Sequence, residues 1–573
     1  MRKFFILLIV ICLSFCCSCN VNSSKKSVND DDKELVYKRI SLINNCDEYK
    51  LENKYIKTYF YENGNVPMAD VNEFVASLDG FIDVEKIWYT VDEANNCLTQ
   101  MRSSGNYTYK MEVFWDSDEI RVNDFGYFYV TKKISGTDYG AHHKWLDVDS
   151  SNEKSVTFNL GDYNFDILYY RKKVLIPVHI LNLLFCSTNQ ANLFYNGESY
   201  QFYFQNPSDE IISSMRQSKL NGTECPDDVR NATVNNLMFT MDYFYGLADQ
   251  KDINRGFENY LTASQLNALR STNCSVYNAA YLQIFQKKLD ELHTNLIFPS
   301  VYNDIDDSFD IFSEDNIGER WKEYYTSLAE LKTDYSNKLG EYSAVRFNGK
   351  TAFVKFNSFR VAPNDVLYDK SGNLKDNAWE YDTFYFMLYA MKMIKNHGGV
   401  ENVVLDLTTN GGGTLGAMYS ALGFLTNEDI VLPSYDTLTK EFRLDYYAID
   451  SDDDGDFYDR DGYTQYDWYI LASKNTFSAA NYFTSVAKNM NIATIIGEKS
   501  GGGMCSVMYS VLPDGTGYRF SSPDTKRYHY YDRDSRKNIY RQIEYGITPQ
   551  YKLDREYFYD LSYLNEFVCG LNV

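Results

Sequence analysis

Two short apolar runs, each followed by a turn of small residues, constrain the fold of this chain most strongly. Residues 403–405 (Val-Val-Leu) precede three glycines at 411–413, and residues 469–472 (Tyr-Ile-Leu-Ala) precede Ser478 and a helix predicted over 479–489. Apolar runs of this length are typical of strands that are buried on both faces of a sheet. The sequence therefore predicts a core in which two such strands each end in a turn that presents polar groups.

The two turns offer a nucleophile and hydrogen-bond donors for an anion. Glycines let main-chain N–H groups approach a developing negative charge, because no Cβ obstructs them. Ser478 stands at the mouth of its helix, where its hydroxyl and the N–H of Ala479 are placed to stabilise an anion. Taken alone, these features have a simpler interpretation, in which Ser478 caps the helix and the glycines form a tight turn.

Two further residues supply a base and an acid. His293 follows an amphipathic helix predicted over 277–292, and Glu544 lies in a Glu-Tyr-Gly-Ile-Thr-Pro segment near the C-terminus. A serine hydroxyl needs a base of near-neutral pKa, and that base needs an acceptor to hold its tautomer. A single histidine is usually a packed or surface residue, and a single glutamate is usually solvated. The prediction of a serine peptidase therefore rests on the whole set.

In this order, the four segments resemble the C-terminal processing peptidase family, in the branch typified by the tricorn core and the chlamydial secreted protease. The resemblance covers roughly residues 255–573. It implies a crotonase-like (ClpP/crotonase) βαβ catalytic core that hydrolyses polypeptides. The roles that it implies are Ser478 as nucleophile, His293 as general base, Glu544 as the acid with Asp290 as its substitute, and the backbone amides of Gly411 or Gly412 and of Ala479 as the oxyanion site.

The chain departs from the better-known bacterial members of this family at one position. Those members use a Ser-Lys dyad, and Gly503 stands where their lysine would be. Lys499 lies four residues too early, and we expect it to be a solvated side chain. The departure favours a relay based on His293 over one based on lysine.

The remaining sequence predicts several domains around this core, in a fold that is α/β and α+β overall. Residues 34–245 contain short alternating strands, residues 246–340 have helical periodicity, and a hairpin is expected at Asn348-Gly349. Two strand–helix pieces, at 65–75 and 175–184, hint at a duplicated module. The predicted division is a signal peptide at 1–19, a flexible tether at 20–33, an N-terminal α+β module at 34–245, a helical cap carrying His293 at 246–340 and a catalytic core at 341–573.

The first residues are typical of a secretory signal. Arg2 and Lys3 precede an apolar run at 4–15, and cysteines follow at 16, 17 and 19. A small residue before a cysteine resembles a bacterial lipoprotein processing site, most simply at Cys19, with Cys16 or Cys17 as alternatives. We expect a lipid anchor that holds the protein at the outer face of a membrane; a simple cleaved signal is the alternative.

Composition excludes some classes of partner. The net charge of −23, with 51 tyrosines among 573 residues, argues against a nucleic-acid-binding surface. The seven downstream cysteines show no metal-binding spacing, so catalysis is expected to need no metal or other cofactor. Cys505, just after the glycines at 501–503, either lines the site or is a small buried apolar residue.

An acidic loop before the second core strand matches the spacing of a calcium-binding loop. Carboxylates at positions 1, 3, 5 and 12 with glycine at position 6 fit the pattern, although aspartate replaces the usual final glutamate. A solvated acidic loop is the alternative. The candidate calcium ligands are Asp450, Asp452, Asp454, Asp456 and Asp461.

Two hypotheses about function remain open. The first is a membrane-anchored serine endopeptidase that acts on polypeptides outside the cytoplasm through an acyl-enzyme on Ser478. The second is a peptide-binding or scaffold lipoprotein that keeps the peptidase fold without turnover.

Overall fold

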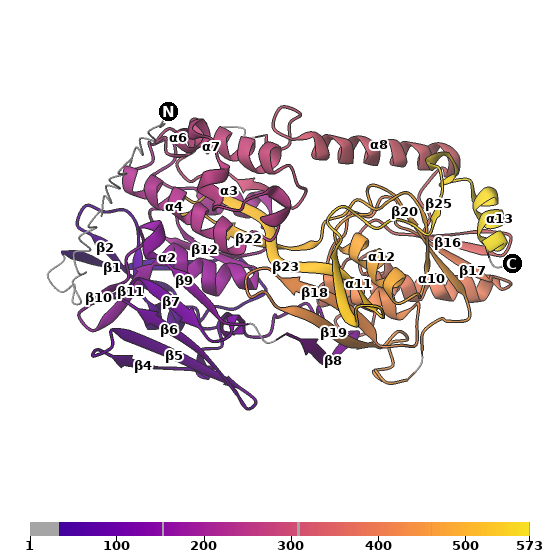
Figure 1. Ribbon diagram of the computed structural model, residues 1–573, viewed down its shortest axis with the longest axis horizontal. Coiled ribbons are helices and arrows are strands. Elements are labelled where there is room, and N and C mark those ends of the chain that lie inside the picture. Colours follow the sequence, from indigo (N-terminus) through magenta and orange to yellow (C-terminus); the bar gives the residue numbers. More distant parts are fainter. Residues whose placement is uncertain (1–33, 152–153, 306–309, 460, 572–573) are drawn as a thin grey trace, which may run out of the picture.

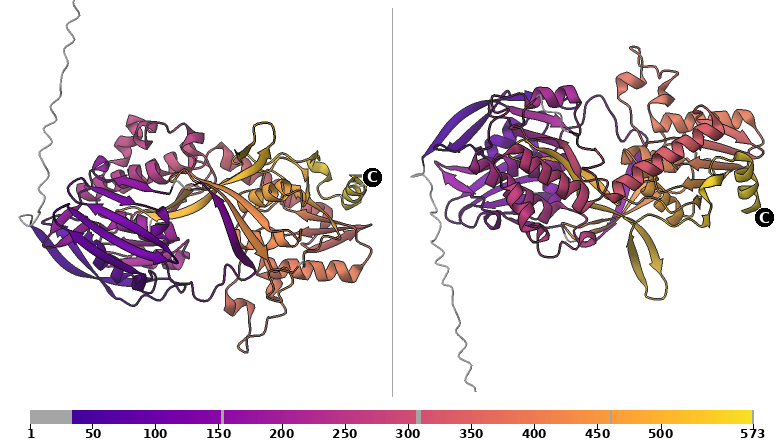
Figure 2. Two further views of the ribbon diagram at one scale, coloured as in Figure 1. Left: turned by 60° about the horizontal axis from the view of Figure 1, so that its bottom comes forward. Right: turned by 90° about the horizontal axis from the view of Figure 1, so that it is seen from above.

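The computed structural model describes residues 34–151, 154–305, 310–459 and 461–571 (Figure 1). Four β-sheets run through this part of the chain. Two of them, formed by strands within residues 35–204, lie at one end of the molecule, and the sheet predicted as the core lies at the other (Figures 1 and 2). The fold is a mixed α/β, multidomain one, as the sequence predicts.

The first seven-stranded sheet contains the two similar strand–helix pieces. Each piece is a strand followed by a short helix, α1 (Val71–Ser77) after β3 and α2 (Val178–Leu181) after β11. The two strands pair with each other in antiparallel fashion, with Ile176 opposite Ala69. In spatial order the strands are β10 (Leu168–Tyr170), β11 (Lys173–Pro177), β3 (Met68–Asp70), β2 (Tyr55–Tyr61), β1 (Leu35–Asn44), β13 (Tyr200–Phe204) and β12 (Ala191–Tyr195).

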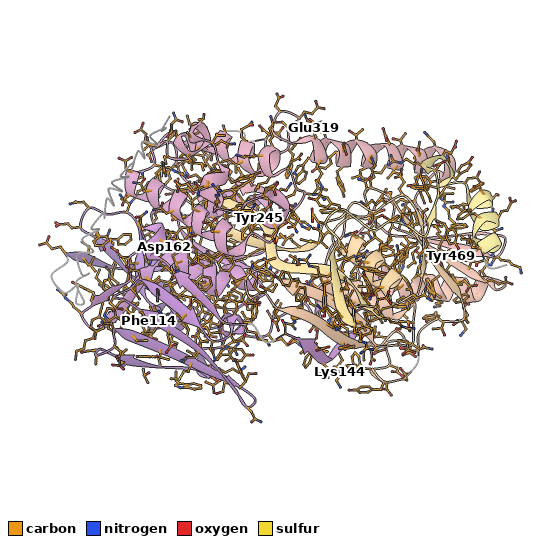
Figure 3. All side chains as sticks on the ribbon, viewed as in Figure 1. Phe114, Lys144, Asp162, Tyr245, Glu319 and Tyr469 are labelled. Atoms are coloured by element: carbon orange, nitrogen blue, oxygen red, sulfur yellow. The ribbon has the colours of Figure 1, made fainter. Side chains whose placement is uncertain are left out.

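A five-stranded antiparallel sheet lies beside it. Its order is β4 (Ile87–Asp92), β5 (Cys97–Ser104), β6 (Tyr107–Phe114), β7 (Glu119–Val122) and β9 (Val156–Asn159). Figure 3 places Phe114 of β6 at this end of the molecule, far from Tyr469 of the core.

A second seven-stranded sheet joins the two ends of the molecule (Figure 2). Its longest strand has 16 residues and pairs with four others. One edge strand, β8, comes from the N-terminal 245 residues and pairs with β19 of the core region. The strands are β14 (Asn295–Phe298), β23 (Gly517–Asp532), β18 (Ile430–Asp436), β19 (Phe442–Ile449) and β8 (His143–Ser150) in order, with β22 (Cys505–Val511) and β24 (Lys537–Gln542) also paired to β23.

The six-stranded sheet holds both predicted core strands next to each other. Five of its strands are parallel, and the first forms the hairpin expected at Asn348-Gly349. The order is β15 (Val345–Asn348), β16 (Thr351–Lys355), β17 (Asn402–Asp406), β20 (Asp467–Ala472), β21 (Thr494–Gly497) and β25 (Tyr551–Lys552). Because neighbouring parallel strands end at the same edge, the turns after β17 and β20 meet there.

Helices cover both faces of this sheet, which explains its apolar runs. Val403 and Leu405 pack on one side with α10 (Thr383–His397), α11 (Leu415–Gly423) and α12 (Ala479–Asn489). Val404 and Leu471 pack on the other side, with α8 (Glu319–Leu339) and α13 (Leu561–Leu571). The predicted bounds of α12 are confirmed. The crotonase-like nature of this core and the domain boundaries stay predictions.

The helical region between the sheets differs from its prediction at one end. The helix expected over 277–292 is α7 (Cys274–Leu282) continued by a π-helical stretch, η7 (Gln283–Leu289). It ends at Leu289 because Asp290 adopts a left-handed conformation with φ of 42°. His293 therefore lies in the loop that leads into β14, and the prediction of a helix reaching residue 292 is wrong.

The other helices are α3 (Asp209–Arg216), α4 (Asp227–Phe244), α5 (Phe257–Tyr260), α6 (Ala263–Leu269) and α9 (Asn364–Leu367), with short turns η1 (Val84–Lys86), η2 (Phe125–Phe128), η3 (Gly161–Tyr163), η4 (Asn182–Cys186), η5 (Ser187–Asn189), η6 (Asp249–Lys251), η8 (Ala378–Glu380) and η9 (Arg555–Tyr557). Over the described ranges, none of the helices combines the length and the apolar character needed to cross a membrane.

Candidate active site

Ser478 occupies a strained backbone position at the start of α12. Its φ of 56° and ψ of −122° lie in a region that residues other than glycine rarely adopt, and its side chain makes no capping hydrogen bond to the helix. Its N–H donates to the carbonyl oxygen of Gly502 at 2.8 Å, which fixes the turn. Ser478 is the N-cap residue of α12 by position, but its hydroxyl does not cap the helix, so capping does not account for a serine here.

The hydroxyl of Ser478 faces His293. Nε2 of His293 lies 2.9 Å from Oγ of Ser478, although 185 residues separate them along the chain. The imidazole is buried and packs against the ring of Phe477, with 4.9 Å between ring centroids. Burial lowers the pKa of His293 to about 4. The ring is therefore neutral at pH 7, the form in which Nε2 can accept the serine proton.

Carboxylates surround His293 without reaching its second ring nitrogen. Nδ1 is buried and has no hydrogen-bond partner within the described part of the chain. Glu291 accepts the main-chain N–H of His293 at 2.7 Å and is also bonded by the hydroxyl of Thr294. Glu291 thus fixes the backbone that carries the imidazole rather than the ring itself.

Glu544 lies close by but binds other groups. Its Oε1 accepts from Nη1 of Arg320 at 2.7 Å, and its Oε2 accepts the N–H of Met504 at 3.0 Å. Burial raises the pKa of Glu544, while Arg320 acts in the opposite direction. Asp290 accepts the N–H of Arg320 at 3.1 Å. No hydrogen bond joins Glu544 or Asp290 to His293 among the described residues, so neither predicted acid orients the ring by direct contact.

Arg320 was not singled out by the sequence, although one signal existed. It lies in the first turn of α8, where a cation is unfavourable beside the positive end of the helix dipole. Its guanidinium also donates to the carbonyl oxygens of Gly501 and Glu544, both at 3.3 Å. Arg320 therefore ties α8 to the glycine loop that holds Ser478. Tyr245, labelled in Figure 3, is buried in the same region, and Glu291 and Glu544 add to the effect of burial in raising its pKa.

The glycine turn after β17 packs directly against the nucleophile. A Cβ on Gly412 would lie 2.8 Å from Cβ of Ser478, and the φ of Gly412 is +105°, so only glycine fits. The N–H of Gly412 donates to Oδ1 of Asn410 at 2.9 Å and is already engaged. In the described structure the amides of Gly411 and Ala479 make no such bond, and they remain the candidate oxyanion donors.

This part of the chain matches a known family. Residues 352–553 match the model described as Peptidase family S41. The match covers 202 of the 573 residues and marks this part of the chain as similar to S41 peptidases. The protein is accordingly a serine-type peptidase, a hydrolase that acts on polypeptides. The S41 match includes Ser478 and Glu544, whereas His293 and Arg320 lie before its first residue.

Solved structures resemble the chain more weakly. One from Parabacteroides merdae ATCC 43184, described as a candidate peptidase, has 18% identity over 60% of this chain and 96% of its own, with a TM-score of 0.39. The photosystem II D1 C-terminal processing protease has 20% identity over 37% of this chain and 46% of its own, with a TM-score of 0.25. Mature CPAF complexed with lactacystin has 15% identity, coverages of 39% and 50%, and a TM-score of 0.26. None of the curated proteins matches the chain.

The position that would hold the lysine of a Ser-Lys dyad is occupied by Gly503. Gly503 has a φ of +81° and its missing Cβ would meet the ring of Phe477 at 2.6 Å, so a side chain does not fit there. Lys499 is exposed, as expected for a solvated side chain. The base in contact with Ser478 is an imidazole.

The site opens into a cavity of about 980 Å³. Ser478 and His293 line it, and so does Cys505, one of the two placements that the sequence left open. Burial raises the pKa of the Cys505 thiol, which disfavours the reactive thiolate form. Residues 34–245 contribute aromatic side chains to the same cavity, namely Tyr49, Phe125, Tyr129, Tyr139, Phe204 and Phe244.

The acidic loop forms two groups of carboxylates ahead of β20. Oxygens of Asp450, Asp452 and Asp454 lie within 4.8 Å of one another, and so do those of Asp452, Asp459 and Asp461. Asp456 belongs to neither group and instead accepts the N–H of Tyr458. The sequence missed Asp459, because it lies outside the calcium-loop spacing. Calcium binding stays a prediction, and Cys19 lies outside the described residues.

Proposed function

We propose that this protein is a membrane-anchored serine endopeptidase that cleaves polypeptides outside the cytoplasm, with Ser478 as nucleophile and His293 as general base. The observation that supports it most is the 2.9 Å contact between Nε2 of His293 and Oγ of Ser478, at the wall of a large cavity. A buried, neutral imidazole in contact with a strained serine is the arrangement that nucleophilic acyl transfer requires.

The reaction follows from these positions. Nε2 of His293 takes the hydroxyl proton as Oγ of Ser478 attacks the carbonyl carbon of the substrate. The N–H groups of Gly411 and Ala479 receive the oxyanion. The imidazolium then gives its proton to the leaving amine, the C–N bond breaks and an acyl-enzyme remains. Water, deprotonated by His293, releases the acid product and restores the serine.

A fluorophosphonate probe tests this proposal directly. Labelling of the folded wild-type protein that disappears in Ser478→Ala supports it. Circular dichroism of both proteins must show the same fold for the comparison to hold. A folded wild-type protein that takes up no probe and cleaves no unfolded casein would remove the peptidase proposal.

One observation favours the second hypothesis, a scaffold lipoprotein without turnover. Nδ1 of His293 has no acceptor in the described structure, so no side chain hydrogen-bonds the imidazolium formed during attack, and Glu291 favours that charge only through space. A scaffold would bind polypeptides with the same affinity in wild type and Ser478→Ala and would cleave none. Measuring both peptide affinity and peptide cleavage for the wild type and Ser478→Ala separates the two hypotheses.

The membrane anchor rests on the N-terminal sequence alone. Cys19 follows the apolar segment of a signal and a small residue, as in lipoprotein processing sites. Metabolic labelling with an alkyne fatty acid should mark the wild-type protein and fail in Cys19→Ala. Cys16→Ala and Cys17→Ala are the matched controls, and loss of label in one of them instead would move the anchor there.

A further inference from the structure

Arg519 lies next to the catalytic histidine in the folded chain. It belongs to β23 and is paired with Asn295 of β14, two residues after His293. Its Nε donates to Oδ1 of Asn295 at 2.6 Å, which holds the guanidinium in place. The side chain is only partly buried, and it lines the same cavity as Ser478 and His293.

The charge of Arg519 is not matched by a carboxylate. Within the described ranges, no Asp or Glu oxygen lies within 4.0 Å of its guanidinium, although the whole chain carries a net charge of −23. The other strong cation of the cavity wall, Lys526, is paired with Asp524 at 2.7 Å. Asp436, a further anion of the wall, accepts main-chain N–H groups of Leu438 and Thr439. Arg519 is thus a cation available to a bound molecule.

The positive charge of Arg519 affects the pKa of His293. Burial is the main cause that lowers the pKa of His293, and Arg519 adds to that lowering. A carboxylate bound to Arg519 would reduce this effect and make His293 a stronger base. Substrate binding and basicity are therefore coupled through this one side chain.

The position of Arg519 in the cavity indicates which part of a substrate it would contact. The histidine of a serine peptidase gives its proton to the leaving amine, so the leaving part of the substrate lies on the imidazole side of the serine. Arg519 is paired with Asn295, two residues after His293 along the chain, and Arg519 and His293 both line the cavity. A bound substrate would therefore present the first or second residue after its scissile bond to Arg519.

We propose that Arg519 binds a carboxylate on the leaving side of the substrate, and so selects polypeptides with an acidic group just after the cleaved bond. The proposal rests on the proposed peptidase function and specifies its substrate. The carboxylate comes either from an Asp or Glu side chain or from the free C-terminus of a short leaving segment. A guanidinium offers paired donors that match the two oxygens of either one.

Paired quenched peptides test the proposal. Each pair has Glu or Gln at the first or second leaving-side position and is otherwise identical. The wild-type protein should cleave the Glu member with a kcat/KM about tenfold higher, the effect of one charge-assisted hydrogen bond. In Arg519→Gln the two peptides of a pair should be cleaved with equal kcat/KM, and Arg519→Lys should keep part of the preference for Glu. Because each ratio is internal to one variant, a general loss of activity does not affect it.

Arg541→Gln is the matched control, since it removes an exposed arginine on β24 that does not line the cavity. It should keep the wild-type ratio. Two results would overturn the proposal while leaving the peptidase function standing. The first is the same Glu-to-Gln ratio of kcat/KM in the wild type and in Arg519→Gln. The second is a wild-type protein that prefers neither Glu nor a free C-terminus. A wild-type protein that cleaves none of the peptides and resists the fluorophosphonate overturns both.

A second set of peptides separates the two sources of the carboxylate. These peptides end one or two residues after the scissile bond, as a free acid or as an amide. A preference for the free acid that vanishes in Arg519→Gln assigns the site to the C-terminal carboxylate. A preference confined to internal Glu assigns it to an acidic side chain. Either result supports carboxylate binding by Arg519.

Discussion

The two walls of the active site are built by different means. The nucleophile wall consists of residues 407–413 and 473–478, and its backbone is fixed by main-chain bonds such as Phe477 N–H to Asn410 oxygen at 3.1 Å. The histidine wall consists of residues 290–298, the first turn of α8 and residues 543–546, and it contains buried charges, with Glu544 paired to Arg320. The first wall depends on backbone geometry, and the second depends on pairing between charges that are far apart in sequence. Substitutions that change charge should therefore damage the second wall far more than the first.

The largest effect is expected from removing the imidazole where the two walls meet. His293→Ala should lower kcat/KM for a peptide substrate by roughly four to six orders of magnitude, because no other base among the described residues contacts Ser478. The control is His397→Ala, which removes an exposed histidine at the end of α10 and should leave the rate unchanged. Equal rates for the two variants would exclude His293 from the chemistry.

The next largest effect concerns the stability of the histidine wall. Arg320→Gln leaves Glu544, whose side chain is 3% exposed, without its cation, and should lower the free energy of unfolding by about 3 kcal/mol. Arg270→Gln breaks the exposed pair with Glu258 and should cost less than about 1 kcal/mol. Urea denaturation measures the free energy of unfolding of both variants. Similar small losses would show that the buried pair does not hold this wall together.

A smaller effect is expected from the backbone of the nucleophile wall. Ser478→Gly relieves the strain of a φ of 56° and should be more stable than Ser478→Ala by about 1 kcal/mol, after the entropy that glycine gains on unfolding is subtracted. Both variants lack the hydroxyl and should be inactive. Thermal unfolding followed by calorimetry gives the difference, and a less stable glycine variant would mean that the turn is unstrained.

The smallest effect concerns calcium and the strand that carries the nucleophile. If the acidic loop before β20 binds calcium with a dissociation constant of about 1 mM, about 2 mM calcium should stabilise the protein by about 0.6 kcal/mol. Thermal unfolding with calcium, and with magnesium at the same concentration, measures this. Asp450→Asn should remove the calcium effect. Equal curves in both salts would identify the loop as solvated charge.

The sequence was informative about the nucleophile wall because its signals are local. The apolar runs, the glycine turn and the helix at 479–489 each follow from neighbouring residues, and the structure gives that helix the predicted bounds. The sequence could not reveal that the N–H of Gly412 donates to the side chain of Asn410, because that hydrogen bond depends on a single side-chain rotamer.

The histidine wall could be predicted only in part. The set of motifs placed His293 with Ser478, and these side chains do meet. The partner of Glu544 could not be found, because 224 residues separate it from Arg320 and pairs of distant charges leave no periodic trace. The end of the helix before His293 was also missed, because Asp290 takes a left-handed conformation that its neighbours do not signal.

The central claim, that buried His293 accepts the proton of Ser478, is tested most directly by the pH dependence of fluorophosphonate labelling. Burial lowers the pKa of His293 to about 4, so the ring stays neutral, and able to accept a proton, at every pH above that value. The labelling rate should therefore hold as the pH falls through 6.5 and drop to half near pH 4, and His293→Ala should label at a negligible rate throughout. A half-maximal rate near pH 6.5, or equal labelling of wild type and His293→Ala, would contradict the claim.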